Sequence, residues 1–367
     1  VTTGQFNTLI GGLVGDSLTS GAYNVAVGYN ALASEDAHGR NIAIGTNALT
    51  TQDAGADAYN LAIGHNAGLS VTTGVQNIII GGLAGDGLTT GERNAAVGHA
   101  ALGTEDTGSR NTAFGWSALT TLNYDGNGYN TAMGYAAGMS VTSGIQNTII
   151  GALAGDALTT GVANAALGYQ ALGAEDTGER NVAIGYQALL KLNYDGAAYN
   201  IGIGYNAGSE ITTGTNNTLI GGHAGDALTT GGLNTAIGYR ALSTEDTGGR
   251  NVAIGYDTLK NQNFDGDAYN IAIGFNAGVN ITTGTLNTII GGNAGDALTT
   301  SVQNVAVGYQ ALSAEDTNSY NTAVGFQALL AQDGGGLNTG VGYKAGDSVT
   351  NGANNTLVGG NAGQAIT

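Results

Sequence analysis

The hydrophobic and polar residues of this chain recur in one short pattern, of which Asn181–Ala188 (Asn-Val-Ala-Ile-Gly-Tyr-Gln-Ala) is an example. Variants of the pattern begin at Asn7 and recur as far as Asn355, with 21 starts in all. Successive starts are separated by 17, 17, 19 and 17 residues, and then the cycle begins again. Repeats this short and this regular predict a solenoid, in which each repeat forms one coil that stacks on the next.

Four coils form a super-repeat of 70 residues, which occurs five times. The super-repeats are residues 7–76, 77–146, 147–216, 217–286 and 287–354, with partial coils at 1–6 and 355–367. The last cycle lacks the two-residue insertion, because Asn321 and Asn338 are only 17 residues apart. We therefore expect residues 1–367 to form a single elongated repeat domain. Because both ends fall inside a coil, we also expect the chain to be an excerpt of a longer fibre.

The first half of each coil predicts a β-strand. Counting from the Asn as position 1, position 4 is always apolar, position 2 is mostly β-branched or small, and position 3 is usually Ala, as in 182–184. Positions 2 and 4 share one face of a strand and position 3 lies on the other. Both faces are apolar or small, as in strands that are covered on both sides. One face must fill the coil, so the other predicts a second layer or a neighbouring chain, and hence an oligomer.

Two columns of identical residues are expected to support the stack. Position 5 is Gly in every coil, which indicates a positive φ or a close approach of two backbones. The Asn side chains at position 1, stacked about 4.8 Å apart, can form a ladder of hydrogen bonds. We expect this ladder to be internal rather than a binding stripe. In the second super-repeat the ladder residues are Asn77, Asn94, Asn111, Asn130, Gly81, Gly98, Gly115 and Gly134.

The second half of the coil varies with its place in the super-repeat. A buried Leu is expected at position 12 of first coils, such as Leu88, and at position 9 of second and third coils, such as Leu102. Third coils carry the insertion, which we expect to form a small protruding loop. The tyrosines that end these loops are possible surface contacts: Tyr59, Tyr129, Tyr199 and Tyr269.

Composition and charge narrow the range of functions. The chain has 66 Gly and no Pro, which excludes collagen, and its regularly spaced hydrophobic residues (42%) argue against disorder. A formal net charge of −18 argues against binding to nucleic acid or to an anionic membrane surface. The sequence contains no apolar run of about 18 residues, so no segment is expected to insert into a membrane. The chain has no Cys, so its stability must come from stacking rather than from disulfides.

Carboxylates are as periodic as the core and suggest one candidate cofactor. Acidic side chains on successive coils could bind one cation, and oxygen ligands suit Ca²⁺. The candidate ligands are Asp86, Glu105, Asp106, Asp156, Glu175, Asp176, Asp226, Glu245 and Asp246. The alternative is that these groups form a solvated acidic stripe or pair with the arginines that end the same coils, such as Arg110. Apart from Ca²⁺, no cofactor is expected.

Aromatic residues occupy position 6 in many second, third and fourth coils, whereas first coils have Gly or Ala there. Such a column could stack on sugar rings, but we expect a packing ladder or a contact between subunits. Catalysis is not expected. The four histidines (His38, His65, His99 and His223) share no repeated context, and the sequence has neither a nucleophile motif nor a phosphate-binding Gly loop.

Residues 181–189 (Asn-Val-Ala-Ile-Gly-Tyr-Gln-Ala-Leu) and 234–242 (Asn-Thr-Ala-Ile-Gly-Tyr-Arg-Ala-Leu) carry a resemblance to known repeats. They resemble the Asn-Ser-Val-Ala-Ile-Gly repeats of trimeric autotransporter adhesin heads. They are still more similar to the Asn-Thr-Ala-Ile-Gly-Tyr-Gln-Ala-Leu repeats of bacteriophage tail-fibre and related surface-fibre sequences. The resemblance covers essentially the whole chain. It implies a parallel β-roll or β-solenoid, three chains side by side in the adhesin case, and attachment outside the cell or on a virion.

These observations predict an all-β parallel β-solenoid of about 21 coils, forming a side-by-side homotrimer. The function we expect is that of a non-enzymatic extracellular fibre segment that mediates adhesion or binding to a host-surface receptor or glycan. Two alternatives remain open. The chain could be a self-assembling filament or matrix subunit that stacks end to end, or a calcium-stabilised β-roll.

Overall fold

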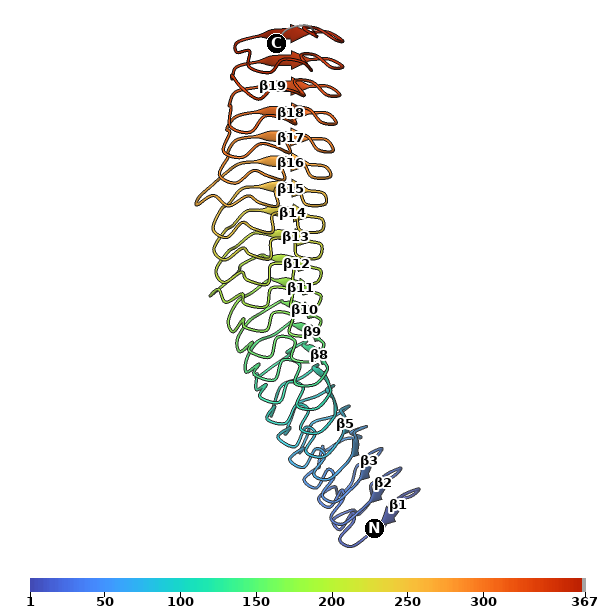
Figure 1. The fold of residues 1–367 in the computed structure, drawn as a ribbon. Coiled ribbons are helices and arrows are strands. Elements are labelled where there is room, and N and C mark those ends of the chain that lie inside the picture. The colour runs from blue at the N-terminus through green and yellow to red at the C-terminus, as the bar shows by residue number, and fades with distance from the viewer. Residues whose placement is uncertain (365–367) are drawn as a thin grey trace. The chain divides into compact units, whose positions relative to one another are not determined.

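The computed structural model describes residues 1–364 and shows an all-β parallel β-solenoid of about 21 coils (Figure 1). Each coil contains one strand of three residues, and each strand occupies positions 2 to 4 after the coil's Asn. The predicted fold class and the predicted strand positions are therefore confirmed. None of the described residues forms a helix that could cross a membrane.

The chain divides into two compact units, which are described separately. Unit 1 comprises residues 1–181 and 195–197, and unit 2 comprises 182–194 and the described residues from 198 onward. Unit 1 contains strands β1 (Thr8–Ile10), β2 (Val25–Val27), β3 (Ile42–Ile44), β4 (Leu61–Ile63), β5 (Ile78–Ile80), β6 (Ala95–Val97), β7 (Thr112–Phe114), β8 (Thr131–Met133), β9 (Thr148–Ile150) and β10 (Ala165–Leu167). Unit 2 contains β11 (Val182–Ile184), β12 (Ile201–Ile203), β13 (Thr218–Ile220), β14 (Thr235–Ile237), β15 (Val252–Ile254), β16 (Ile271–Ile273), β17 (Thr288–Ile290), β18 (Val305–Val307), β19 (Thr322–Val324), β20 (Thr339–Val341) and β21 (Thr356–Val358).

Within each unit, every strand pairs in parallel with the next strand along the chain. The register is direct, so that equivalent positions face each other: Thr131 of β8 pairs with Thr148 of β9, and Ile237 of β14 pairs with Ile254 of β15. This register places each side chain above its equivalent in the neighbouring coil. Identical residues therefore form columns throughout each unit.

Position 3 of the strand faces the interior of the coil, and its volume is matched to that of position 9. In the coil of Asn77, a large residue at position 3 (Ile79) accompanies a glycine at position 9 (Gly85). In the next coil the sizes are reversed, with Ala96 at position 3 and Leu102 at position 9, both fully buried. Leu88, at position 12, is also fully buried, as expected. The alternation keeps the narrow interior filled at close packing.

The glycine at position 5 is required by a close approach of successive backbones. Gly151 has a φ of 132°, and a Cβ added to it would lie 2.5 Å from the carbonyl oxygen of Gly168 in the next coil. Any side chain there would combine a strained φ with a backbone clash.

The Asn side chains at position 1 are buried and form a ladder along each unit. Asn77 is typical: its Oδ1 accepts the backbone N–H of Asn94 at 2.9 Å, and its Nδ2 donates to the carbonyl oxygen of Gly91 at 2.9 Å. Each amide thus satisfies one backbone donor and one backbone acceptor that the short strands leave unpaired. In third coils the loop differs, and the Nδ2 atoms of Asn41, Asn251 and Asn321 are buried without a partner.

Candidate functional site

An apolar surface follows the strands on the outside of each unit. We call it the outer strand face and define it as the side chains at positions 2, 4 and 6 of every described coil. In the coil of Asn111 these are Thr112, Phe114 and Trp116. Phe114 is 51% exposed and Trp116 is 46% exposed. Among residues 1–364, most side chains of this face are partly or largely exposed, so the second side of the strand inferred from the sequence is accessible in each unit.

The outer strand face carries no Asp, Glu, Lys or Arg at any of its positions in the 21 coils. The chain as a whole has 27 Asp and Glu and nine Lys and Arg, all of which lie elsewhere. On a face that stays in contact with water we would expect charged side chains, because monomeric soluble proteins rarely expose large contiguous apolar patches. A consistent exclusion of charge over so many coils is typical of a surface that is buried against a partner.

The aromatic residues at position 6 stack on one another in runs of consecutive coils. Trp116 and Tyr135 stack with ring centroids 5.0 Å apart, and Tyr256 stacks on Tyr239 at 5.4 Å and on Phe275 at 5.6 Å. First coils have Gly or Ala at this position. In one of them His223, at position 7, lies between two rings of the column, 5.2 Å from Tyr205 and 6.1 Å from Tyr239. Each ring remains partly exposed, so the column presents aromatic edges to its surroundings.

The loop tyrosines lie on the surface and are held in place by the preceding coil. Their exposed fractions are similar: Tyr59 53%, Tyr129 53%, Tyr199 51% and Tyr269 48%. A guanidinium from the preceding coil lies over three of the rings, with Arg40, Arg110 and Arg250 at 5.6 to 5.7 Å from the centroids. Short parallel bridges, such as Ser109 to Asn127, join the loops of the second, third and fourth super-repeats to the coil before them. The loops are therefore ordered parts of the surface rather than free protrusions.

The glutamates of the Glu-Asp pairs contradict the expectation of a solvated stripe or of pairing with arginine. Their side chains are fully buried: Glu35, Glu105, Glu175, Glu245 and Glu315. The arginines pair with other groups, as Arg40 does with Asp57 at 2.6 Å. Each glutamate instead accepts backbone N–H groups of its own turn, as Glu105 does from Gly108 at 2.8 Å. The sequence did not predict this burial, because a glutamate that caps a buried turn has the same neighbouring residues as an exposed glutamate would have.

Burial affects the protonation of these carboxyls. It raises the pKa of Glu105 to about 7, an effect that the hydrogen bonds from Gly108 and Tyr124 only partly offset. Burial also raises the pKa of Glu245 and Glu315 above the usual value for the same reason. The half-buried Asp86 shows a raised pKa as well.

The nine carboxylates predicted as calcium ligands are not brought together in groups of three or more metal-binding side chains anywhere in residues 1–364. The glutamates point into the coils, and the aspartates use their oxygens locally. Asp106 accepts the N–H of Thr107 at 2.6 Å, and Asp226 lies 2.8 Å from Nδ1 of His223. Asp86 and Asp156 are half-buried one super-repeat apart. The equivalent residues of the other super-repeats follow the same arrangement: Glu175, Asp176, Glu245 and Asp246.

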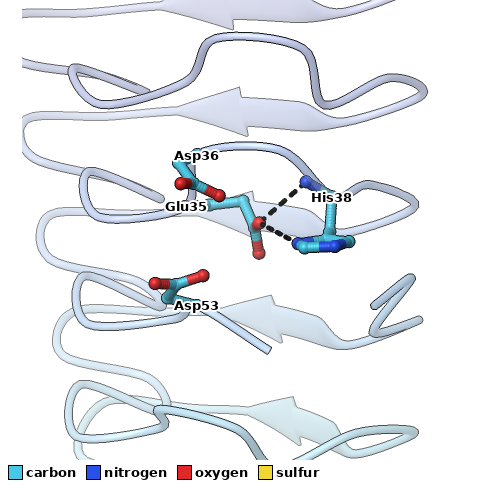
Figure 2. A group of neighbouring side chains, drawn as sticks. All are labelled: Glu35, Asp36, His38 and Asp53. Carbon is cyan, nitrogen blue, oxygen red and sulfur yellow. Dashed lines mark hydrogen bonds and ion pairs between the residues drawn. The ribbon is translucent and has the colours of Figure 1, made fainter. Parts of the chain in front are cut away.

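One cluster of potential metal ligands does occur in the described chain, in the first super-repeat. Glu35, Asp36, His38 and Asp53 each offer a ligand atom, and these atoms all lie within 4.8 Å of one another. Figure 2 shows the Glu35 carboxylate between the His38 ring and Asp53, which comes from the neighbouring coil. Oε1 of Glu35 accepts the backbone N–H of His38 at 3.1 Å and lies 3.6 Å from His38 Nδ1.

This cluster exists because only the first super-repeat combines a histidine in the turn with an aspartate at this place in the loop. His38 stands where the next super-repeat has Gly108, and Asp53 stands where it has Asn123. The aspartate of the next super-repeat's loop, Asp125, lies two places further along and accepts the Thr107 hydroxyl at 2.5 Å. The signal in the sequence that could have revealed the cluster is the histidine at position 38, where the other super-repeats have Gly or Asn.

Comparison with known proteins adds no family to these observations. No protein-family model matches the chain, and no curated protein or solved structure matches it either. What the structure supports is a repeat protein with a β-solenoid fold of about 21 turns, built mainly on 17-residue repeats.

Proposed function

We propose that this chain is a non-enzymatic segment of an extracellular fibre, displayed on a cell surface or a virion, that mediates adhesion or receptor binding. The observation that carries the proposal is the outer strand face, which consists mainly of apolar residues and threonines, carries no Asp, Glu, Lys or Arg, and is partly exposed along both units. The resemblance of the repeat to adhesin-head and tail-fibre repeats supports the same reading.

In this proposal the outer strand face is covered by further copies of the same chain, as in a homotrimer. Two arguments favour a second copy as the partner. A copy has the same coil-to-coil spacing, about 4.8 Å, so its ridges match those of this face over any number of coils. The chain also has a net charge of −18. Two copies can approach closely where neither presents a charge, whereas their acidic surfaces repel each other.

Sedimentation of the purified chain tests this arrangement. A species of three times the 36.3 kDa chain mass supports it. Replacing exposed residues of the face with charges, as in Ile271→Lys and Ile290→Lys, should lower the mass toward that of one chain. The matched control is Tyr269→Lys, which adds the same charge on an exposed loop and should leave the mass unchanged. Polymers that grow with concentration would favour the end-to-end filament, and a monomer would contradict the proposal.

Adhesion in this proposal comes from the loop tyrosines. Four super-repeats present a half-exposed tyrosine at an equivalent place, so weak individual contacts add by avidity when the target is also multivalent. A tyrosine with a neighbouring guanidinium offers an aromatic face and hydrogen-bond donors together, which suits the rings and hydroxyls of a glycan.

Binding of the chain to printed glycans and to cultured host cells tests the adhesive role. Replacing Tyr59, Tyr129, Tyr199 and Tyr269 together with Ser should abolish most of the binding, whereas one replacement alone should weaken it only modestly. The control is the double variant Tyr23→Ser and Tyr320→Ser, which removes exposed tyrosines outside these loops. Equal loss in the control, or undiminished binding by the fourfold variant, would contradict the assignment.

A further inference from the structure

The cluster of Glu35, Asp36, His38 and Asp53 contains two buried polar atoms that have no hydrogen-bond partner. They are Oε2 of Glu35 and Nδ1 of His38, and the whole Glu35 side chain is inaccessible to solvent. A buried carboxylate oxygen without a donor is costly, so it calls for a specific explanation.

The second and fourth super-repeats show that the coil does not by itself leave this oxygen unpaired. Oε2 of Glu105 accepts the backbone N–H of Tyr124 at 3.4 Å, and Oε2 of Glu245 accepts that of Phe264 at 3.3 Å. In the first super-repeat the corresponding loop supplies no such donor to Glu35. It supplies the carboxylate of Asp53 instead, while the turn supplies the imidazole of His38 (Figure 2). Oε2 of Glu315 in the fifth super-repeat also lacks a partner, but there Asn318 stands at the place of His38, so the turn offers no imidazole.

We propose that Glu35, Asp36, His38 and Asp53 form a binding site for one Zn²⁺ ion that links the second and third coils of the first super-repeat. The four groups provide three carboxylate oxygens and one imidazole nitrogen, which is a complete set for tetrahedral Zn²⁺. Ca²⁺ takes six to eight ligands, all oxygen, so an imidazole among the four groups argues against it. Imidazole with carboxylates suits Zn²⁺ and its neighbours in the transition series.

The geometry requires only local adjustment. Tetrahedral bonds of about 2.0 to 2.1 Å place ligand atoms roughly 3.3 Å apart, whereas the present separations reach up to 4.8 Å. Asp36 and Asp53 are exposed and His38 is partly exposed, so their side chains can move inward by rotation. Glu35 is the fixed member, because its Oε1 is already held by the backbone of His38.

The chain offers little competition for the metal. It has no cysteine, and its other three histidines lie in different coils. Zinc retained by tag-free, full-length protein after dialysis therefore reports on this cluster, and the visible absorption of added Co²⁺ reports on tetrahedral coordination. We expect one Zn²⁺ per chain, a tetrahedral Co²⁺ spectrum, and no displacement by an equal concentration of Ca²⁺.

Two variants test the assignment with little risk to folding, because each installs a residue that the next super-repeat already carries. His38→Gly reproduces Gly108, and Asp53→Asn reproduces Asn123. Each should weaken Zn²⁺ binding by at least about tenfold, which is the lower end of the cost of losing even a group that only orients a ligand. The controls are His65→Ala and Asp16→Asn, which remove an imidazole and a carboxylate of the same unit outside the cluster. Absence of retained zinc, an octahedral Co²⁺ spectrum, or equal losses in the controls would overturn the proposal.

Discussion

The amide of Asn234 shows how one residue links a coil to its neighbour. Its Oδ1 accepts the backbone N–H of Asn251 at 3.0 Å, and its Nδ2 donates to the carbonyl oxygen of Gly248 at 2.9 Å. The next residue of the ladder, Asn251, accepts the N–H of Asn270 at 3.2 Å, but its Nδ2 has no partner. The same type of side chain therefore makes different numbers of hydrogen bonds in neighbouring coils, and we expect its contribution to the free energy of unfolding to differ accordingly.

This difference predicts unequal costs of removing the two amides. Asn234→Ala leaves two buried backbone groups unpaired, whereas Asn251→Ala leaves one. At about 1 to 3 kcal/mol for each unsatisfied group, we expect Asn234→Ala to reduce the local free energy of opening by at least about 1 kcal/mol more. Native-state hydrogen exchange of the surrounding coils measures both values. Equal costs would show that the ladder hydrogen bonds do not determine stability here.

At the scale of the element, a coil is a three-residue strand followed by corners that are stabilised by buried leucines. Three residues bury too little area to be stable alone, so each coil depends on its neighbours and on the leucine at position 9 or 12. Leu228 is fully buried at position 12, and Leu233, a few residues later in the same coil, is 49% exposed.

These two leucines form a matched pair for testing the core. Leu228→Ala should destabilise unit 2 by about 2 to 5 kcal/mol, because it removes buried methyl groups and leaves a cavity. Leu233→Ala makes the same chemical change at the surface and should cost less than about 0.5 kcal/mol. Urea denaturation of the two variants beside the parent chain measures the difference. A similar shift for both would mean that the interior is not packed as described.

The coil also shows which features of the fold the sequence could predict and which it could not. The strands, the direct register and the two positions of the buried leucine follow from periodicity, because 21 repeats of one pattern leave few alternatives. Which strand side faces inward could not be predicted, since Ala183 and its neighbours Val182 and Ile184 are all apolar. The burial of Glu105 was missed because its capping role depends on the fold of its own turn.

The candidate site was the least predictable part of the molecule. Periodic carboxylates suggested a repeated calcium site, but periodicity also places each carboxylate where the same local hydrogen bonds satisfy it. The cluster that the structure does assemble arises from the aperiodic residue His38 and from Asp53, whose loop position is held by Asn in the next super-repeat. Sequence periodicity reveals the architecture, and departures from it mark the candidate site.

At the scale of the whole molecule, buried acidic groups and a large negative charge predict an unusual dependence of stability on pH. The pKa of Glu105 is raised to about 7 from an ordinary value of 4.5, and those of Glu245, Glu315 and Asp86 are raised too. Between pH 4.5 and about 7 the folded chain keeps protons that the unfolded chain has lost. For the glutamates the stabilisation is thus complete below pH 4.5, and for Asp86 below pH 3.8, and it is lost as the pH rises through the folded-state pKa values.

We therefore expect the chain to melt at a higher temperature near pH 5 than near pH 8. Glu105 alone could contribute up to roughly 3 kcal/mol, and relief of repulsion among the acidic groups acts in the same direction. The exposed pairs of Arg40 with Asp57 and Arg250 with Asp267 oppose this only weakly. Calorimetric melting across this pH range checks the sign, and a melting temperature that rises from pH 5 to pH 8 would refute it.

A single substitution separates burial of the charge from the general acidity of the chain. Glu315→Gln removes a buried charge whose Oε2 has no donor, so the new amide group displaces no hydrogen bond. It should stabilise the chain at pH 8 by about 1 kcal/mol and by less at pH 4.5, because burial raises the pKa of Glu315 above its ordinary value and so favours the neutral carboxyl at low pH. The comparison is Glu105→Gln, whose amide would face the N–H of Tyr124 and should stabilise less. Thermal melting of both variants at the two pH values decides between these outcomes.

The central claim is that the outer strand face is buried between copies of the chain, and Trp116 tests it most directly. It is the chain's only tryptophan, and it lies on this face, 46% exposed in a single copy. Quenching of its fluorescence by iodide in the native protein should be several-fold weaker than for the same chain unfolded, and should increase when charges on the face separate the copies. The account would be contradicted if iodide quenched the native protein as strongly as expected for a half-exposed indole, and equally in the variants that carry charges on the outer strand face.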